Sequence, residues 1–407
     1  MYLRLALLNT FRNKRRALLN ILMIAGGVTG IILFEGFSHH VLGLMRDVST
    51  KSNYGHIQVA KRSFWNKSSD DSAENLIADG ERLVADLRKL PGVSSVSGRI
   101  SFFGLLGNGE RTVGASAFSI DPVAEPEVLK SYKIVDGRTL TAEDAPTTNI
   151  LMGAGLARAL KAKPGDDLTI IAVTYDKVIN AIDVQVQGMF ETALVELDDT
   201  AFVLPVSAAQ RLLDTKNVEK IVVRLQDTDR TDSVMADVQD RLAPEAGELL
   251  TKPWYVLDRL YWQVRDFYNI QNTIVATIII SLILLGILNT LSMSVFERTG
   301  EIGTMRSLGA KRRQVIAQFV LEGAVLTGFG IVAGTVCGVA LATAINGLKL
   351  EVVLPNTSAP IFVHIDMVPK AFAVAWGLTF VAAIVASIIP AYRITRLRIV
   401  DALRYNI

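Results

Sequence analysis

The hydrophobic positions of the chain gather into four long runs, and polar positions are frequent between them. The runs are 17–38, 273–295, 315–345 and 371–390. The second and fourth runs contain no charged residue, the third contains only Glu322, and the first contains Glu35 near its end. An α-helix rises about 1.5 Å per residue, so about 20 residues cross the roughly 30 Å hydrocarbon core of a bilayer. The pattern therefore predicts four transmembrane helices.

The first run follows a cluster of basic residues, as the hydrophobic region of a cleaved signal peptide does. However, it is longer than the typical signal-peptide core of about 7–15 residues. No clear small-residue cleavage site precedes Glu35. We therefore expect the first run to remain in the protein as a membrane anchor.

Lysine and arginine are distributed unevenly around the four runs. Residues 1–16, 296–314 and 391–407 carry five, five and four of them, whereas 346–370 carries two. Loops rich in basic residues stay on the cytoplasmic side of the membrane. This predicts that both termini and the segment 296–314 lie in the cytoplasm, and that 39–272 and 346–370 lie outside.

The long region 39–272 has the sequence pattern of a folded α/β domain. Two strand–helix–strand patterns occur in it, at 54–60, 72–90 and 91–96 and again at 220–227, 231–243 and 252–258. Two such units can pair into one small α/β layer. Between them, 112–215 shows short alternating strands separated by turns. This stretch predicts a mainly β insertion that forms a second subdomain.

The ends of this region approach the membrane. Residues 254–271 are rich in Trp and Tyr, which favours either an aromatic belt at the interface or a helical stalk that continues the second span. Residues 39–52 can extend the first span in the same way. The only cysteine, Cys337, lies in the third run, so the outer region has no disulfide. About 230 residues are enough to bury a core without one.

Catalytic motifs are absent from the sequence. It contains no G-x-x-x-x-G-K-[ST] phosphate-binding loop and no G-x-S-x-G nucleophile motif, and its histidines lack metal-ligand spacing. The net charge is +2, and the basic residues that cluster do so at the membrane edges. We therefore expect a non-enzymatic membrane protein that binds no cofactor, no metal and no nucleic acid.

The segment 296–314 is charged and contains glycine, although it lies between two membrane-length runs. Ile302, Met305 and Leu308 are spaced by three residues within it. Periodicity alone leaves two interpretations. One is an interfacial helix anchored by basic residues, and the other is a coupling helix that docks into a cytoplasmic motor.

Several residues inside the runs predict close helix contacts. Glu322 lies about seven residues into the third run, where a charge is costly unless it faces protein. It either pairs with a basic residue near the inner interface or acts as a latch for the segment 296–314. Small residues recur every four positions, which lets helices approach closely, both within a chain and at a dimer interface. They are Gly26, Gly30, Gly330, Gly334 and Gly338.

Two stretches resemble the FtsX-like permeases of ABC transporters, the group that includes the MacB-type and the lipoprotein-releasing permeases. They are "FERTGEIGTMRSLGAKRRQVIAQFVLEGAVLTGFGIVAG" (296–334) and "IIPAYRITRLRIVDALRY" (388–405). In the outer region, "ILMGAGLARALKAKPGDDLTI" (150–170) and "GMFETALVELDDTAFVLPVSAAQRLL" (188–213) are most similar to the lipoprotein-releasing, LolC/LolE-type branch. The order of one span, a large outer domain and three further spans also matches.

The resemblance implies an α-helical protein of the bacterial inner membrane, with a large α+β extracytoplasmic domain between the first and second transmembrane helices. Such permeases work by mechanotransmission. A pair of permeases, identical or related, binds a cytoplasmic ATPase dimer that holds ATP and Mg, and ATPase movements pass along the helices to the outer domain. The implied function is lipoprotein release, or extraction of another hydrophobic cargo, with a periplasmic carrier or adaptor and membrane lipids as further partners. A MacB-like efflux permease and an FtsX-like regulator of an envelope hydrolase are the alternatives.

Two groups of residues follow from this resemblance and from position. The residues expected to couple to the ATPase are Glu297, Glu301, Ile302, Met305, Arg306, Leu308 and Gly309. Apolar residues near the outer ends of the first two spans are expected to line a cargo entry, on position alone. They are Phe34, Phe37, Val41 and Phe267.

Overall fold

The computed structural model describes residues 12–66, 72–192, 195–243, 248–352 and 361–396. Much of the predicted N-terminal segment, the middle of the predicted 346–370 loop and the end of the predicted tail lie outside these residues. The chain divides into two compact units. The helical unit comprises Met1–Gly43, Val264–Leu350 and Phe362–Ile407, and the α/β unit comprises Leu44–Gln263 and Glu351–Ile361.

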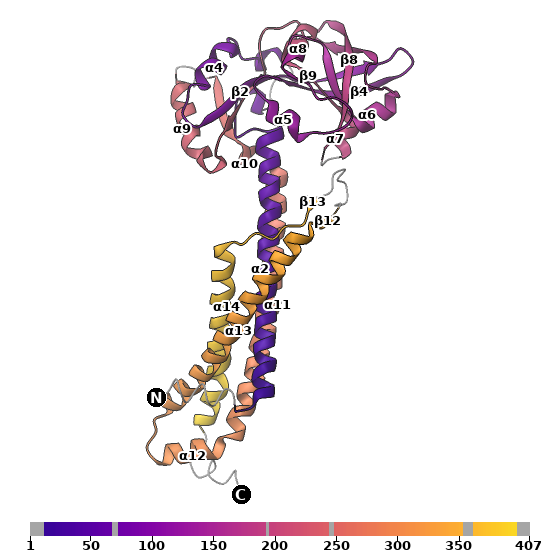
Figure 1. Ribbon diagram of the computed structural model, residues 1–407. Helices are drawn as coiled ribbons and strands as arrows, with labels where there is room; N and C mark the ends of the chain where they lie inside the picture. The colour runs from indigo at the N-terminus through magenta and orange to yellow at the C-terminus, as the bar shows by residue number, and fades with distance from the viewer. Residues whose placement is uncertain (1–11, 67–71, 193–194, 244–247, 353–360, 397–407) are drawn as a thin grey trace. The chain divides into compact units, whose positions relative to one another are not determined.

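The helical unit is built on four long helices (Figure 1). They are α2 (Lys14–Val48), α11 (Arg259–Glu297), α13 (Arg312–Leu348) and α14 (Pro369–Thr395). Each is long enough and apolar enough to cross a membrane. Each predicted run lies inside one of these helices, which continues beyond the run at both ends. The aromatic stretch 259–271 is therefore helical, as the first part of α11. A short helix, α12 (Thr299–Ser307), follows α11.

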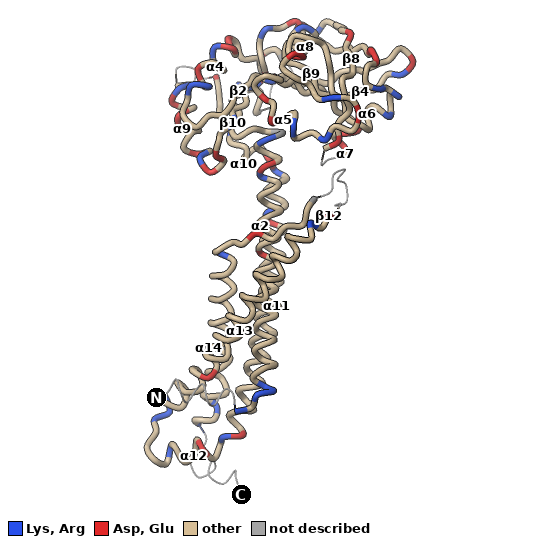
Figure 2. Tube along the Cα trace, viewed as in Figure 1, with Lys and Arg blue, Asp and Glu red and all other residues tan. Residues whose placement is uncertain are grey.

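Charge is sparse along the middle of the long helices and returns at their ends (Figure 2). Glu322 in α13 is an exception, and its side chain is only 4% exposed. Between Gln314 and Leu348, α13 carries no other charged residue. This distribution is typical of helices whose middle parts face lipid or one another.

Glycines let α13 pack closely on α2. A Cβ atom on Gly334 would lie 2.6 Å from the carbonyl oxygen of Ala25 and 2.8 Å from the Cβ of Val28. The hydroxyl of Thr29 donates a 2.9 Å hydrogen bond to the carbonyl of Gly334. Gly330 is similarly close, because its Cβ would lie 2.5 Å from an Ile24 methyl. These two glycines of the predicted stripe therefore serve packing within the chain.

The other predicted glycines are less restricted. A Cβ on Gly26 would meet nothing within 4 Å, whereas its neighbour Gly27 would place one 2.7 Å from Ile283 of α11. Gly27, rather than Gly26, therefore permits the close contact of α2 with α11. Gly338 would make only ordinary contacts, at 3.6 Å, and Gly30 one of 3.4 Å.

The α/β unit contains a four-stranded antiparallel sheet with the order β11–β1–β10–β2. Its strands are β1 (Ile57–Lys61), β2 (Val93–Arg99), β10 (Lys220–Leu225) and β11 (Leu249–Pro253). Two helices, α4 (Gly80–Leu87) and α9 (Thr231–Arg241), bury apolar residues in the same core as these strands. The apolar side chains of α9 at Val234 and Val238 are fully buried, as expected for one face of an amphipathic helix.

Two elements of this sheet differ from the sequence pattern. The strand predicted at 252–258 ends at Pro253, and Trp254–Leu257 forms the short helix α10. The alternating pattern of 252–258 was misleading because Trp254 is buried against the ring of Tyr261 rather than on a sheet. The two ring centroids lie 4.9 Å apart. The helical period at 72–90 is also divided, into a 3₁₀ turn at Ser72–Asn75 and the shorter α4.

A second sheet has seven strands in the order β5–β8–β6–β9–β4–β3–β7, and β8 also pairs with β7. Its strands are β3 (Ser101–Gly107), β4 (Thr112–Ile120), β5 (Lys133–Gly137), β6 (Asn149–Gly153), β7 (Asp167–Val173), β8 (Ile179–Glu191) and β9 (Ala201–Pro205). The sheet begins at Ser101, earlier than the predicted boundary near 112. Because β8 spans 13 residues, it can pair with three strands and close this sheet on itself.

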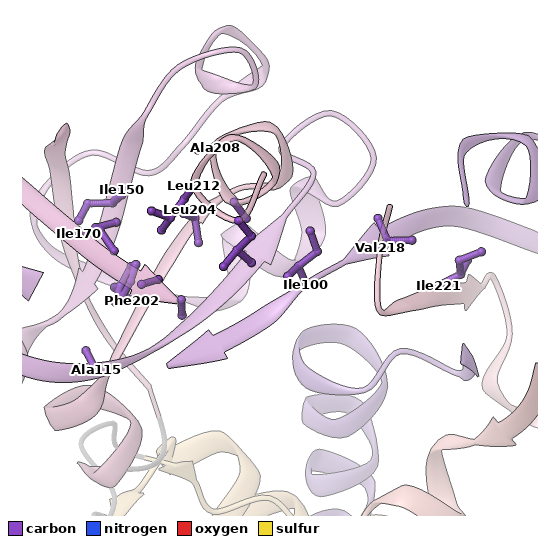
Figure 3. Close-up of a cluster of buried hydrophobic side chains, with 14 of the residues drawn as sticks. Ile100, Ala115, Ile150, Ile170, Phe202, Leu204, Ala208, Leu212, Val218 and Ile221 are labelled. Carbon is purple, nitrogen blue, oxygen red and sulfur yellow. The ribbon is translucent and has the colours of Figure 1, made fainter. Parts of the chain in front are cut away.

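One hydrophobic cluster runs through both sheets (Figure 3). Ile150, Ile170 and Phe202 contribute from the seven-stranded sheet, and Ile221 contributes from the four-stranded sheet. Ile100 lies between β2 and β3 and belongs to the same cluster. Because this cluster is shared, the two sheets belong to one folded unit.

A buried ion cluster connects the two sheets. Glu125, immediately before α5 (Pro126–Ser131), contacts Arg99 of β2 at 2.9 Å and also pairs with Arg224 of β10. The Glu125 side chain has no exposed surface. Burial raises the pKa of Glu125, but the two arginines outweigh burial and lower this pKa to about 2. The charged carboxylate thus ties the turn after β4 to the smaller sheet.

Candidate coupling site

The connection between α11 and α13 has a defined geometry. Helix α12 ends in a Schellman motif: the N–H of Gly309 donates to the carbonyl of Arg306 at 3.1 Å, and the N–H of Ala310 donates to that of Met305 at 3.0 Å. Gly309 has φ +97°, a conformation that other residues rarely adopt. The glycine therefore ends α12 and lets the chain turn into α13.

The predicted coupling residue Ile302 points into the protein. It is 4% exposed and packs in a cluster with Val295, Val315, Phe319, Ala391 and Ile394 from α11, α13 and α14. Ile302 therefore fixes α12 against three long helices. A direct contact with a partner protein is not available to this side chain in the structure described.

Two apolar side chains of the predicted set face solvent instead. Met305 is 39% exposed, and Leu308, in the turn after α12, is 84% exposed. The following residues Lys311, Arg312 and Arg313 are also exposed. Arg306 is half-buried between these positions. The segment thus presents two apolar side chains beside a basic stretch, which suits a surface that a partner covers.

The two acidic residues of the predicted set are held by the start of the chain. Arg16 of α2 contacts Glu297 at 2.8 Å, and Arg12 contacts Glu301 at 3.0 Å. All four side chains are at least one-third exposed, so each pair contributes at most about 1 kcal/mol. The sequence pattern related the basic residues before the first run to a signal-peptide front and to membrane orientation, and not to these contacts. Their role as partners of the α11–α12 segment depends on the tertiary fold.

A buried ion pair lies behind this surface. The guanidinium of Arg298 donates a 3.0 Å hydrogen bond to the carboxylate of Glu322, and the two side chains are 7% and 4% exposed. Arg298 occupies the joint between α11 and α12, whereas Glu322 lies inside α13. The partner of Glu322 is thus a basic residue of the segment 296–314 itself. The pair joins α12 to the middle of the helical unit.

The ion pair borders a cavity of about 190 Å³. Its walls come from the start of α2, the end of α11 and the middle of α13, and they include Arg12, Arg16, Glu297, Arg298 and Glu322. The cavity is mixed in character, because apolar residues such as Leu291 and Leu326 also contribute. The three ion pairs and this cavity form one polar region at one end of the helical unit.

The residues predicted to line a cargo entry lie on two helices of the helical unit. Phe34, Phe37 and Val41 of α2 are half-buried, and Phe267 of α11 is 60% exposed. Within the residues that the structure describes, no group of three or more His, Cys, Asp or Glu side chains is arranged to hold a metal ion.

The chain has four membrane-length helices, a folded α/β unit between the first two of them in sequence, and a short helix between the second and third. These features define an ABC transporter permease of the LolC/MacB type. Residues 17–241 match the MacB-like periplasmic core domain, and residues 273–399 match the FtsX-like permease C-terminal domain. The chain therefore belongs to this family of permeases, which confirms the resemblance found in the sequence. The family and the apolar helices indicate a protein of the inner membrane.

Individual relatives have low sequence identity to this chain but match nearly its whole length. The chain is 26% identical to the lipoprotein-releasing system transmembrane protein LolC of Neisseria meningitidis, over 97% of this chain and 96% of that protein. It is 24% identical to the macrolide export ATP-binding/permease protein MacB of Agrobacterium fabrum, over 98% of this chain but 60% of that protein. Among solved structures, the periplasmic region of MacB from Actinobacillus actinomycetemcomitans covers 52% of this chain and 93% of its own, at 14% identity and a TM-score of 0.39.

Proposed function

We propose that this protein is the permease subunit of a lipoprotein-releasing ABC transporter, which uses ATP hydrolysis by a separate ATPase to extract lipidated cargo from the membrane. The observation that supports lipoprotein release is the similarity to LolC along nearly the whole length of both chains. The MacB of Agrobacterium fabrum is an ATP-binding/permease protein by name, whereas this sequence contains no phosphate-binding loop. ATP and Mg would be bound by the partner ATPase.

The proposed coupling surface consists of Met305 and Leu308, with Gly309 shaping the turn between α12 and α13. An ATPase that covers these side chains would remove them from water. Ile302 and the Arg298–Glu322 pair would then pass a displacement of α12 to α11, α13 and α14. The Arg12–Glu301 and Arg16–Glu297 pairs would pass it to α2.

The proposed topology places both termini and the segment 296–314 in the cytoplasm and the regions 39–272 and 346–370 outside. A second permease, a copy of this chain or a relative, would complete the transporter. Phe34, Phe37, Val41 and Phe267 would line the cargo entry between the two. A periplasmic carrier would receive the lipoprotein.

The coupling proposal is tested by changing Met305 and Leu308 together to alanine. We expect the double variant to retain less than about one-tenth of the ATPase in a detergent pull-down, because truncating the residues that dominate an interface centre costs about 2 kcal/mol or more, and about 1.4 kcal/mol corresponds to tenfold in affinity. The matched control is Leu348→Ala, at the last residue of α13, where the leucine is 68% exposed. Normal ATPase retention by the double variant would exclude this surface as the docking site.

The cargo is tested by purifying the tagged chain from its native membrane and identifying retained proteins by mass spectrometry. Lipoproteins and an ATPase support lipoprotein release. An ATPase with a periplasmic adaptor favours the second candidate, a MacB-like efflux permease, which the match of 17–241 to the MacB-like periplasmic core domain supports. An ATPase with a cell-wall hydrolase and no cargo favours an FtsX-like regulator.

A further inference from the structure

Three of the four histidines of the chain surround one carboxylate in the helical unit. Nδ1 of His39 lies 2.7 Å from one Asp366 oxygen, and Nδ1 of His40 and Nε2 of His364 lie 3.4 Å and 3.8 Å from the other. The rings of His40 and His364 are tilted against each other, with centroids 5.0 Å apart. His39 and His40 belong to α2, whereas Asp366 belongs to the segment that leads into α14.

The backbone around Asp366 is held in place by its neighbours. The amide side chain of Asn346, on α13, accepts a 2.8 Å hydrogen bond from the N–H of Ile365 and donates a 3.1 Å bond to its carbonyl. The N–H of Asp366 donates to the carbonyl of Gly36 at 3.3 Å. A Cβ on Gly36 would lie 2.5 Å from the Asp366 carbonyl oxygen, so glycine permits this approach. The meeting of the histidines and the carboxylate is therefore built into the packing.

Charged residues other than the histidines also lie on the elements that carry this cluster. On α2, the carboxylate of Glu35 accepts a 3.3 Å hydrogen bond from Asn272 of α11. Lys370 in the first turn of α14 and Lys349 after α13 are both exposed. In the part of the chain that the structure describes, the ion pairs of Asp366 come from histidines alone.

Histidine is the residue type that changes charge between pH 5 and 8. Neutral imidazoles offer Asp366 hydrogen bonds only, whereas protonated ones add charge–charge attraction. Protonation of one of these histidines therefore adds an attraction to Asp366 across the contact between α2 and the segment 363–368, and this attraction is lost when the proton leaves.

We propose that His39, His40, His364 and Asp366 form an acid-responsive latch that fastens the end of α2 to the segment leading into α14. A closed latch holds two transmembrane helices of the permease together, and an open one lets them separate. With the proposed topology, the latch faces the extracytoplasmic side and adjusts the permease to the pH there. The latch itself does not depend on the identity of the cargo.

The latch is tested by hydrogen–deuterium exchange of the full chain in lipid nanodiscs, between pH 5.5 and 8.0 and without added metal. After correction for the intrinsic pH dependence of exchange, we expect peptides covering 362–368 to be about three- to tenfold more protected at pH 5.5, the effect of partly exposed ion pairs. Asp366→Asn should abolish this difference, and His39→Gln should reduce it. Glu35→Gln is the control and should leave the difference unchanged.

Three outcomes would overturn the proposal. Equal protection at both pH values in the unchanged protein would show that no latch operates. A pH difference that survives in Asp366→Asn, or in His364→Gln if the first variant does not fold, would assign the effect to other groups. A difference that appears only with added Zn²⁺ and disappears with EDTA would make the cluster a metal site rather than a proton-responsive latch.

Discussion

The Arg298–Glu322 pair gives the sharpest test of how the candidate coupling site works. Both side chains are less than one-tenth exposed, and their atoms meet at 3.0 Å. Replacing Glu322 by Met removes the carboxylate that the buried guanidinium of Arg298 meets at 3.0 Å. Removal of one partner from a buried pair costs about 3–5 kcal/mol of the free energy of unfolding, whereas replacement of both by apolar residues is often nearly neutral.

The assay is reversible unfolding of the full chain in mixed detergent micelles, for Glu322→Met, Arg298→Met and the double variant with both substitutions. We expect each single variant to lose about 3 kcal/mol or more and the double variant to lose less than about 1.5 kcal/mol. The resulting interaction energy measures the pair. Single variants that lose less than about 1 kcal/mol, or a double variant that loses the sum of both, would refute the reasoning.

The double variant also separates the two interpretations of Glu322. If the pair serves only as an anchor, the stable double variant should still associate with the ATPase and support cargo release. If it acts as a latch for the 296–314 segment, release should fall although stability and ATPase association are preserved. The measurement is ATP-dependent release of lipoprotein from proteoliposomes, with the ATPase rate recorded in parallel.

Three further predictions address packing, the outer unit and topology. Gly334→Val should destabilise the helical unit by about 1–3 kcal/mol, because its Cβ would meet the backbone of α2, whereas Gly338→Ala should be tolerated; micelle unfolding measures both. Glu125→Gln should raise hydrogen exchange in β2 and β10. The folded protein lowers the pKa of Glu125 from 4.5 to about 2. The stability that the Glu125 carboxylate provides should therefore be complete above pH 4.5 and decline between pH 4.5 and 2. In a background without the native cysteine, a cysteine at Ser233, which is exposed, should react with an impermeant reagent added outside, and one at Ser307 should react only after permeabilisation; the opposite pattern would reverse the topology.

The elements with strong local patterns were predictable from the sequence. The four apolar runs became α2, α11, α13 and α14, because a length of apolar residues is a local property that no distant contact can alter. Gly309 was within the predicted segment, and its positive φ explains why a glycine stands there. The strand predicted through Trp254 was wrong because alternation over a few residues does not distinguish a strand from a short helix whose aromatic residue finds a distant partner.

The candidate site was predictable only in part. The segment 296–314 was identified, but its periodicity did not distinguish Ile302 from Met305 and Leu308. Burial separated them: Ile302 packs among three helices, and Leu308 is 84% exposed. No local signal could assign Arg298 as the partner of Glu322 or Arg12 as that of Glu301, since these pairs join residues 24 and 289 positions apart.

The sequence by itself determined the membrane-spanning helices, the family and the absence of a phosphate-binding loop, since hydropathy and short motifs are written into neighbouring residues. The tertiary structure alone decided which glycines permit helix contact, which charges neutralise each other and which side chains of α12 remain free to meet a partner. It also brought His39 and His40 to Asp366 beside His364, although His364 follows them by more than 320 residues. The physical reason is that close packing and charge pairing depend on distances in space, and only the folded chain sets those distances.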